Sequence, residues 1–417
     1  MKKLLVFSAC FCSLISQAQT TKIDTVSTAA TYTNQIWYSL SNDEVASQPK
    51  DNWDLGIEIT GFNSSILVNT QKTGVAAYAT PYTWTNWSAF DTTGYKKWTA
   101  LHNSDTMWEI GALNKTGVYD TEDMGWGTYD MSSHAVLGTR LFLLALPGNK
   151  FYKLGVKSLI AGTYTITYKS IDGTDSSTFT VSKSNFADRH FAYYRFDTKS
   201  LFDREPNKND WDLTFTKYIY NNYPAGGGQF IPYGVTGILQ NKGVKVAELR
   251  TVDVAQTNDY MSATYSNHIN IIGSDWKTFT GTAFEITDSL VYFVEDIEDN
   301  YWKVVMTGFS GSATGNYIFS KQLLSTVGIN DATSENRISV YPNPSKSGAA
   351  LTLLGDFGSE NINFQIYAAD GKSVYSNVLI GNSSFNAIEL PLNLSKGIYF
   401  IQLEVSGKIT STKLVIE

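Results

Sequence analysis

Cysteine is nearly absent from this chain. Its 417 residues include two cysteines, Cys10 and Cys12, and both lie close to the N-terminus. The first residues combine a basic start, an apolar run and small residues around Ala18, which predicts a signal peptide over residues 1–18. A lipoprotein signal ending at Cys10 is the alternative, but only about four apolar residues precede it, against the usual ~7–15. The predicted mature chain therefore has no thiol, which excludes disulfides, cysteine nucleophiles and thiolate metal sites.

Positive charge is also scarce. Lys and Arg total 32 against 39 Asp and Glu, a net charge of -7 that becomes -9 once Lys2 and Lys3 leave with the signal peptide. A chain of this sign does not attract polyanions, so nucleic acid is not an expected partner. After the signal peptide no apolar run approaches the ~20 residues of a membrane span, so the mature chain is expected to have no transmembrane segment.

A sustained helical period is missing as well. Hydrophobic residues instead occur in short alternating or β-branched runs, such as 163–168 and 338–341, separated by Gly, Asn, Asp and Ser. The composition is 42% hydrophobic with 10 Trp, 25 Tyr and 22 Phe, enough to form a globular core. We therefore expect an all-β fold in two or three domains, with residues 326–337, TVGINDATSENR, as a polar linker.

Before this linker the chain contains a degenerate internal repeat. The landmarks recur in the same order: 52–55 (NWDL) with 210–213 (DWDL), 74–76 (GVA) with 243–245 (GVK), 140–145 (RLFLLA) with 290–294 (LVYFV), and 162–164 (GTY) with 315–317 (GNY). The order is constant while the loop lengths drift. This predicts two tandem copies of one β domain, over residues 31–183 and 184–325.

The last 80 residues carry three turn motifs in order. They are Pro342-Asn343-Pro344, Asp370-Gly371 and Gly397 at the start of a strand, which suit a small Ig-like β-sandwich over residues 338–417. This segment resembles the type A C-terminal sorting domain of the type IX secretion system of Bacteroidota. The resemblance implies recognition by the type IX translocon after passage through the periplasm, removal of the tail, and release or attachment at the outer cell surface.

The first repeat resembles the HmuY family of haem-binding proteins. The residues that carry the resemblance are the 52–55 motif, Gly125-Trp126, and the strand 140–144 that leads to Lys153-Leu154. It implies two HmuY-like β domains and a function in iron acquisition, with haem or a host haem protein as partner.

The resemblance also implies where a haem iron would be held. Without cysteine, the axial donors must be His, Met or Tyr. One family ligand lies five residues after the Trp of the Gly-Trp pair, which here is Met131, with His134 just beyond; the other lies 25–30 residues earlier, near His102 and Met107. We take His102 and Met131 as the candidate metal ligands, with Trp126 among the aromatic walls. The second repeat offers Gly281 at the matching position, so only the first is expected to bind haem.

Two alternatives remain open at this stage. Met131 and Met107 are equally typical of core filling, and His102 and His134 of solvated loops. The sequence has no nucleophile elbow, zinc helix or phosphate loop, so we expect no enzyme activity. The alternative function is a surface adhesin or a scaffold that binds carbohydrate or protein without haem, because tandem β domains rich in Tyr and Trp suit such partners. Surface polysaccharide is a further candidate partner, through attachment of the exported protein.

Overall fold

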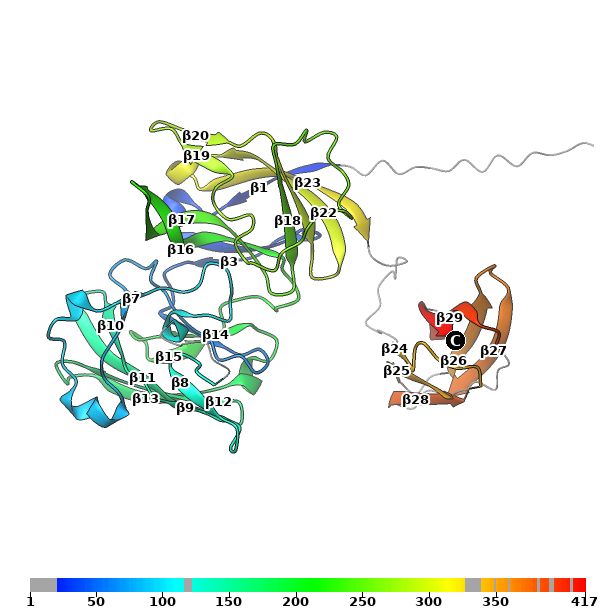
Figure 1. Cartoon of the computed structure of the whole chain (residues 1–417), viewed down its shortest axis with the longest axis horizontal. Coiled ribbons are helices and arrows are strands. Elements are labelled where there is room, and N and C mark those ends of the chain that lie inside the picture. Colours follow the sequence, from blue (N-terminus) through cyan, green and yellow to red (C-terminus); the bar gives the residue numbers. More distant parts are fainter. Residues whose placement is uncertain are drawn as a thin grey trace, which may run out of the picture. The chain divides into compact units, whose positions relative to one another are not determined.

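The structure is a computed structural model that describes residues 21–115, 122–326, 339–348, 350–358, 361–380, 383–389, 394–405 and 408–417 (Figure 1). The predicted signal peptide and all of the predicted linker except residue 326 lie outside these ranges. The chain divides into two compact units, residues 1–327 and 328–417, which are described separately. No helix of the described ranges is long and apolar enough to span a membrane.

The protein is all-β, as the sequence predicts. The helical segments of the described residues are short 3-10 helices of three to six residues: η1 (Ala30–Tyr32), η2 (Trp84–Ala89), η3 (Tyr95–Lys97), η4 (Ala112–Asn114), η5 (Lys183–Phe186) and η6 (Gly311–Ala313). The strands alternate buried and exposed positions where one face meets water; β12, for example, reads Thr163 to Ser170 with Tyr164, Ile166 and Tyr168 fully buried. Burial of every second side chain explains why the aromatic content is so high.

The first unit contains two lobes, each with its own hydrophobic core. The first lobe is built from β4 to β15, and its core contains Leu55, Trp126 and Tyr164. Its strands are β4 (Leu55–Glu58), β5 (Ile66–Val68), β6 (Ala76–Ala79), β7 (Ala100–Leu101), β8 (Gly127–Asp130), β9 (Ala135–Gly138), β10 (Phe142–Leu146), β11 (Lys150–Ile160), β12 (Thr163–Ser170), β13 (Ser176–Ser182), β14 (Phe191–Arg195) and β15 (Ser200–Phe202). The sheet β13-β12-β11-β10-β6-β7, to which β8 and β9 attach, faces the smaller sheet β15-β14-β4-β5 across this core.

The second lobe combines the beginning and the end of the first unit. Its core contains Val26, Tyr38, Leu213 and Tyr317. Its strands are β1 (Lys22–Ser27), β2 (Asn34–Ser39), β3 (Asp43–Pro49), β16 (Leu213–Gly226), β17 (Gln229–Gln240), β18 (Lys245–Arg250), β19 (Lys277–Phe279), β20 (Phe284–Ile286), β21 (Leu290–Glu295), β22 (Asn300–Phe309) and β23 (Asn316–Thr326). They form the sheets β1-β23-β22-β21-β18, β17-β16-β2-β3 and β19-β20. In Figure 1 the blue N-terminal strands accordingly lie among green and yellow ones.

The two copies of the repeat make equivalent contacts. Leu55 pairs with Tyr194 in the first lobe, and Leu213 pairs with Tyr38 in the second. In each lobe the Asp before the Leu also makes the same hydrogen bond. The Asp54 carboxylate accepts the Phe196 N–H at 2.9 Å, and the Asp212 carboxylate accepts the Leu40 N–H at 2.7 Å. Likewise Tyr164 pairs with Val181, and Tyr317 with Val26. Strands β1, β2 and β3 therefore correspond to β13, β14 and β15.

These correspondences show that the copies exchange their N-terminal strands. The first copy begins with β1–β3, which complete the second lobe, whereas the second copy begins with β13–β15, which complete the first. The predicted boundaries, residues 31–183 and 184–325, therefore do not follow the lobes. The internal repeat could not reveal the exchange. The strands that begin at Leu55 and Leu213 have equivalent sequences, so either one could pair with the β2–β3 hairpin or with the β14–β15 hairpin in the same register.

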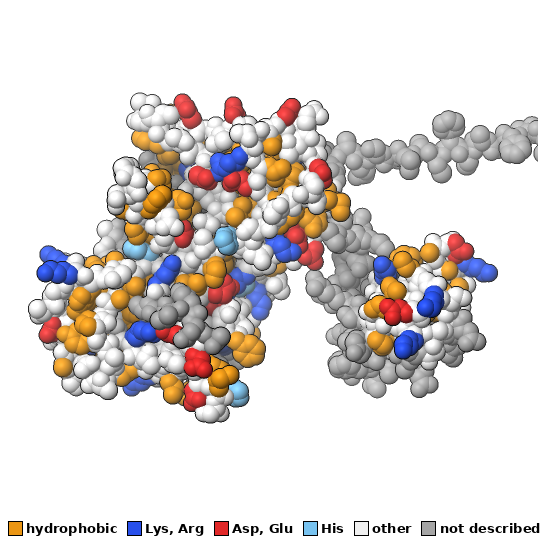
Figure 2. Space-filling model, in the orientation of Figure 1, with side chains coloured by type: hydrophobic (Ala, Val, Ile, Leu, Met, Phe, Trp, Pro, Cys, Tyr) orange, Lys and Arg blue, Asp and Glu red, His pale blue; other side chains and the backbone are white. Residues whose placement is uncertain are grey.

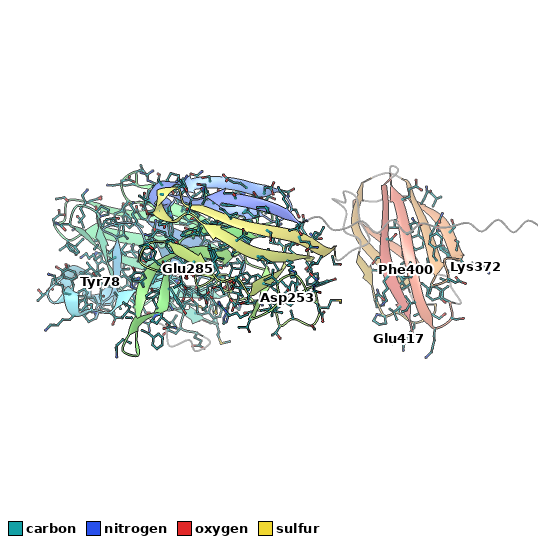
Figure 3. The ribbon with its side chains drawn as sticks, turned by 90° about the horizontal axis from the view of Figure 1, so that it is seen from above. Tyr78, Asp253, Glu285, Lys372, Phe400 and Glu417 are labelled. Carbon is teal, nitrogen blue, oxygen red and sulfur yellow. The ribbon has the colours of Figure 1, made fainter. Side chains whose placement is uncertain are left out.

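The second unit is a small two-sheet sandwich. Its strands are β24 (Ser339–Tyr341), β25 (Ala350–Gly358), β26 (Asn361–Ala368), β27 (Ser373–Ile380), β28 (Ser383–Glu389), β29 (Gly397–Val405) and β30 (Lys408–Ile416). Sheets β24-β25-β28 and β27-β26-β29-β30 enclose a core that includes Leu351, Phe364 and Ile401. Figure 3 shows side chains on both faces of these strands, with Phe400 of β29 and Lys372 of the β26–β27 turn labelled.

The Pro-Asn-Pro motif anchors the first turn of this sandwich. The Asn343 amide donates to the Lys413 carbonyl at 2.7 Å, and its side-chain oxygen accepts the Val415 N–H at 2.9 Å. In the Asp-Gly turn, Gly371 has a φ of 83°, a conformation that favours glycine, and the Asp370 carboxylate accepts the Lys372 N–H at 3.1 Å. Two of the three sequence motifs thus have a direct structural role.

Strand exchange predicts that the two lobes unfold together. Ile36 of β2 is buried in the second lobe, so Ile36→Ala should lower the free energy of unfolding by about 2–5 kcal/mol. Because β2 and β3 lead directly into the first lobe, both lobes should respond in one transition. Tryptophan fluorescence in urea measures this, since all ten tryptophans lie in the first unit.

The matched control is Ile23→Ala on β1. Ile23 is 71% exposed, so its truncation should change the free energy of unfolding by no more than about 0.5 kcal/mol. Two separate transitions, of which Ile36→Ala shifts only one, would contradict the exchanged arrangement.

Candidate functional site

The residues predicted to hold haem lie in separate parts of the first lobe. His102 follows β7 and is half-buried, with Nδ1 at 3.4 Å from the Thr70 hydroxyl, and burial lowers its pKa. Met131 and His134 belong to the turn between β8 and β9, where Met131 is 70% exposed. His134 Nδ1 lies 2.9 Å from the Tyr129 hydroxyl.

The strand register sets the distance between these two places. Strand β11 serves as a common reference for both places. Leu101, next to His102, lies level with Tyr152 of β11 through the pairings of β7, β6 and β10, whereas Val136 of β9 pairs directly with Leu159 of β11. Seven residues along a strand correspond to about 20 Å, at ~3.3 Å per residue. Two axial donors on one iron lie about 4 Å apart, at ~2 Å per bond. This structure therefore does not bring His102 and Met131 together, although the sequence interpretation paired them.

Trp126 and Met107 do not join either group. Trp126 is fully buried, and its indole N–H donates to the Ser64 carbonyl at 2.9 Å, so the side chain is part of the core of the lobe. Met107 is exposed on the loop after β7. No cluster of three or more His, Cys, Asp or Glu arranged to hold a metal ion occurs among the residues that the structure describes.

A different site lies where the two lobes meet. A cavity of about 90 Å³ is lined from the first lobe by Trp53, Leu67 and Tyr193, and from the second by their counterparts in the repeat, Trp211, Leu239 and Trp37. Both copies therefore present equivalent apolar side chains to one pocket. Thr70, whose hydroxyl lies 3.4 Å from His102 Nδ1, and Asn103, which follows His102 in sequence, also line the pocket, so His102 lies close to its wall.

Two buried side chains in this pocket lack hydrogen-bond partners. His190 is 6% exposed, and neither of its ring nitrogens has a partner; Trp211 is 3% exposed, and its indole N–H has none. The two rings lie edge to face, with centroids 6.1 Å apart. Burial, with Lys242 nearby, lowers the pKa of His190 to about 3, so the imidazole is neutral. Buried polar groups are normally paired, so these nitrogens are exceptions among the side chains that form the pocket wall.

Glu205 forms the acidic part of the wall. One of its carboxylate oxygens accepts the backbone N–H groups of His190 and Phe191, and the other accepts the Tyr193 hydroxyl at 3.0 Å. Complete burial raises the pKa of Glu205 to about 7, because desolvation of the charged form outweighs these bonds and Arg204. The carboxyl group is thus committed to holding the start of β14 in place.

One loop of the first lobe joins the lobes beside the pocket. The Trp108 indole N–H donates to the Gln240 carbonyl at 2.9 Å. Asn221 of β16 donates to the Asn103 carbonyl at 3.0 Å and to Asp105 at 2.8 Å. This loop therefore fixes the pocket wall to the second lobe.

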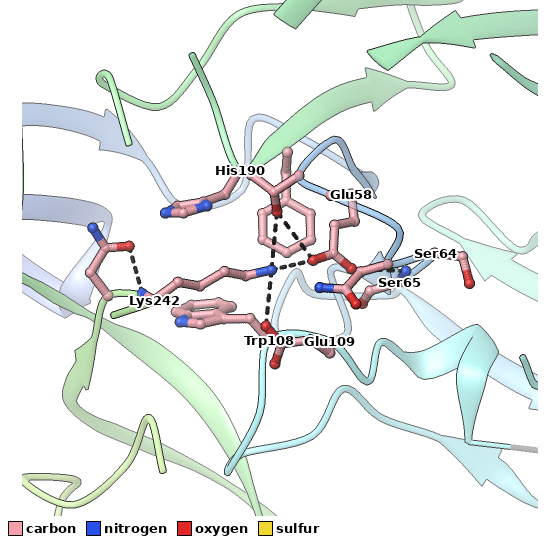
Figure 4. A network of polar contacts seen from close by, with 12 residues as sticks. Glu58, Ser64, Ser65, Trp108, Glu109, His190 and Lys242 are labelled. Atoms are coloured by element: carbon pink, nitrogen blue, oxygen red, sulfur yellow. Dashed lines mark hydrogen bonds and ion pairs between the residues drawn. The ribbon is translucent and has the colours of Figure 1, made fainter. Parts of the chain in front are cut away.

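Lys242 makes an ionic contact between the lobes. It reaches from the β17–β18 turn to the carboxylate of Glu58, which is fully buried, and to Glu109 at 3.2 Å (Figure 4). Its ammonium also lies 5.4 Å from the centre of the Phe191 ring. In Figure 4 His190 and Trp108 are drawn on the two sides of the Lys242 chain. The ion pair thus joins β4 of the first lobe to the second lobe.

Figure 2 shows acidic and basic side chains interspersed on the visible face of the described residues, with apolar groups between them. On that face no continuous basic surface is present to attract a polyanion.

Comparison with known families identifies the second unit. Residues 339–417 match the model of the secretion system C-terminal sorting domain. The second unit is a sorting domain of the type IX secretion system. The protein is therefore exported by that system, to the cell surface or beyond it. The motifs at Asn343 and Gly371 predicted this correctly from the sequence.

Comparison with curated proteins finds no match for the chain. Among solved structures, it is similar at 11% identity and a TM-score of 0.17 to PorZ, an essential bacterial surface component of the type IX secretion system of Porphyromonas gingivalis, over 69% of this chain and 41% of PorZ. Dimeric latent PorU of the same organism gives 8% identity and 0.17, over 95% of this chain and 34% of PorU. The chain spans less than half of either protein, and scores this low assign it neither a fold nor an activity.

Sequence reasoning missed the pocket between the lobes. The sequence analysis recorded Trp211 as part of the repeat, but it could not predict that Trp211 packs against His190. That contact depends on the exchange of strands between the lobes. An available signal was that Trp53 and Trp211 occupy equivalent positions in the repeat, which is expected of residues that face each other across a pseudo-symmetric interface.

The contact between Lys242 and Glu58 yields a prediction about stability. Lys242→Met leaves a fully buried carboxylate without its cation, which should lower the free energy of unfolding by about 3–5 kcal/mol. The double variant Lys242→Met/Glu58→Gln should recover most of this loss, because the charge itself is removed. Urea unfolding followed by tryptophan fluorescence measures both.

Lys245→Met is the matched control, since the Lys245 side chain is 42% exposed and an ion pair with such an exposed partner, here Glu295, is worth at most about 1 kcal/mol. An equal loss in Lys242→Met and Lys245→Met would show that the contact between the lobes contributes little.

Proposed function

We propose that this type IX-exported protein is a non-catalytic binding protein of the cell surface, and that it takes a small ligand into the pocket between the two lobes. The observation that carries the proposal is the aromatic cavity to which both copies of the repeat present equivalent side chains. Ligand pockets are typically apolar with a few polar groups that fix orientation, which is the composition found here.

The size of the pocket limits the ligand. Sites for drug-sized molecules measure roughly 300–1,000 Å³, well above the 90 Å³ found here. A whole haem is therefore too large for the cavity in this form. Haem capture, which the resemblance to the HmuY family implies, remains a hypothesis that requires the β8–β9 turn and the loop after β7 to approach each other.

The test is a titration of the mature full-length chain with a panel of probes: indole, benzoate, methyl pyranosides and hemin. At least one small probe should raise the unfolding midpoint saturably and slow amide exchange in residues 68–71 and 216–219, which line the pocket. The sorting domain should be unaffected and provides the internal control.

Three outcomes are distinguishable. Slower exchange in the two pocket segments supports the proposal. No change there with any probe contradicts it. A Soret shift with hemin that Met131→Ala and His102→Ala each weaken, without protection of residues 216–219, would replace the proposal with haem capture.

A further inference from the structure

Strand β13 forms one edge of the eight-stranded sheet of the first lobe. Its neighbour on one side is β12, and no strand of the described residues pairs with its other side. At one end of the β12–β13 pair the Ser170 N–H donates to the Asp175 carbonyl at 2.7 Å. At the other end the Lys183 N–H donates to the Gly162 carbonyl at 2.9 Å. Because bonded and non-bonded pairs alternate along an antiparallel ladder, the backbone groups of the even-numbered residues 176–182 point away from β12 to the open edge.

The other long edge strands of the first unit carry features that discourage pairing with a second chain. Strand β3 begins with Asp43 and Glu44, β18 carries Lys, Glu and Arg, and β17 contains Pro232. The edge strands β5, β7, β8, β15, β19 and β20 have only two to four residues. Charge, proline and short length all protect a sheet edge. Strand β13, with the sequence SSTFTVS, has neither charge nor proline, and its pairing with β12 contains no bulge.

The counterpart of β13 in the second lobe is β1, which differs at the central position. Phe179 pairs with Ile166 on β12, and at the equivalent place Asp24 of β1 pairs with Phe319 on β23. If β1 paired with its own copy about Asp24, two carboxylates would face each other, which is destabilising. Of the two equivalent edges, only β13 therefore suits pairing with an identical strand.

The sequence of β13 reads almost the same in both directions from Phe179. When a second copy lies antiparallel with Phe179 opposite Phe179, Thr178 is opposite Thr180 and Ser176 is opposite Ser182. These four are the residues whose backbone groups point to the open edge, so each can exchange N–H···O=C bonds with its opposite residue. Pairs of Thr and pairs of aromatic residues are also favourable across strands. The strand is thus complementary to itself in backbone and in side chains.

We propose that the protein forms a symmetric homodimer in which β13 pairs antiparallel with β13 of a second copy, centred on Phe179. The two eight-stranded sheets then become one continuous sheet, and the interface is isologous, as in most dimers. Phe179 is half-buried and stacks on Tyr194 with ring centroids 3.9 Å apart. The second Phe179 would cover the exposed part of this ring. The competing occupant of the edge is an extended segment of another protein.

Sedimentation velocity of the mature full-length chain over a range of concentrations tests the proposal, and the dimer fraction should rise with concentration. Thr178 and Thr180 are exposed, so both accept charged side chains without disturbing the core. Thr178→Lys/Thr180→Lys places like charges opposite each other in the dimer. This variant should raise the dissociation constant about tenfold or more, because like charges across an interface are strongly unfavourable.

Thr178→Glu/Thr180→Lys is the matched control. It places a carboxylate opposite an ammonium at both ends of the same pairing, so the dimer should persist. Both variants lose the bond between the Thr167 and Thr178 hydroxyls, 2.9 Å long, so any effect of that loss on folding is shared. Equal unfolding midpoints in urea would confirm that the two variants fold alike.

The results that would overturn the proposal are distinct. A chain that stays monomeric at every concentration leaves the edge to another protein. A dimer that neither variant weakens is formed by a different surface. Equal weakening by the two variants contradicts the register centred on Phe179, because only that register turns the second variant into complementary pairs.

Discussion

The contact between the two lobes of the first unit depends on a buried cation, Arg204. It follows β15 and is almost completely buried, yet its guanidinium donates to Asn52 at 2.7 Å, Gln35 at 2.8 Å and the Pro49 carbonyl at 3.1 Å. All three acceptors belong to the β2–β3 hairpin or to the residues just after it. Burial of an unpaired charge is costly, so Arg204 is tolerable only where these acceptors surround it.

The aromatic neighbours of Arg204 complete the enclosure. Its guanidinium carbon lies 4.8 Å from the Trp37 ring centre, 5.3 Å from that of Tyr193 and 5.9 Å from that of Trp53. Trp37 and Tyr193 are counterparts in the two copies, so the cation sits where the exchanged hairpins meet. Arg suits this place better than Lys, because its planar group can bond in several directions and still stack on rings. The hairpin crossing in turn places Trp53, Trp37 and Tyr193 in the wall of the pocket, so the site depends on the exchange.

The sequence carried enough information for the fold class and the export route. Alternation in runs such as β12 predicts strands regardless of partner, and the Asn343 and Gly371 motifs act locally, so both kinds of signal can be read without a structure. The repeat was visible for the same reason, through Trp53 and Trp211. Strand exchange was not, because partner choice between two chemically equivalent copies depends on long-range contacts such as Arg204. The candidate haem ligands His102 and Met131 were paired from their spacing along the chain. That spacing does not predict how far apart the strands of the sheet place the two side chains.

The most direct test of the exchange uses the scarcity of cysteine, because residues 19–417 contain none. On β1, Ile23 pairs with Ser320 of β23, and paired Cα atoms of antiparallel strands lie within the range of a disulfide. The double variant Ile23→Cys/Ser320→Cys should form an intramolecular disulfide under mild oxidation, seen as a mobility shift of the monomer that reduction reverses. In unexchanged tandem domains the partner of Ile23 would instead be Thr167 of β12, the counterpart of Ser320. A disulfide in Ile23→Cys/Thr167→Cys, with none in Ile23→Cys/Ser320→Cys, would contradict the exchanged fold and the pocket that depends on it.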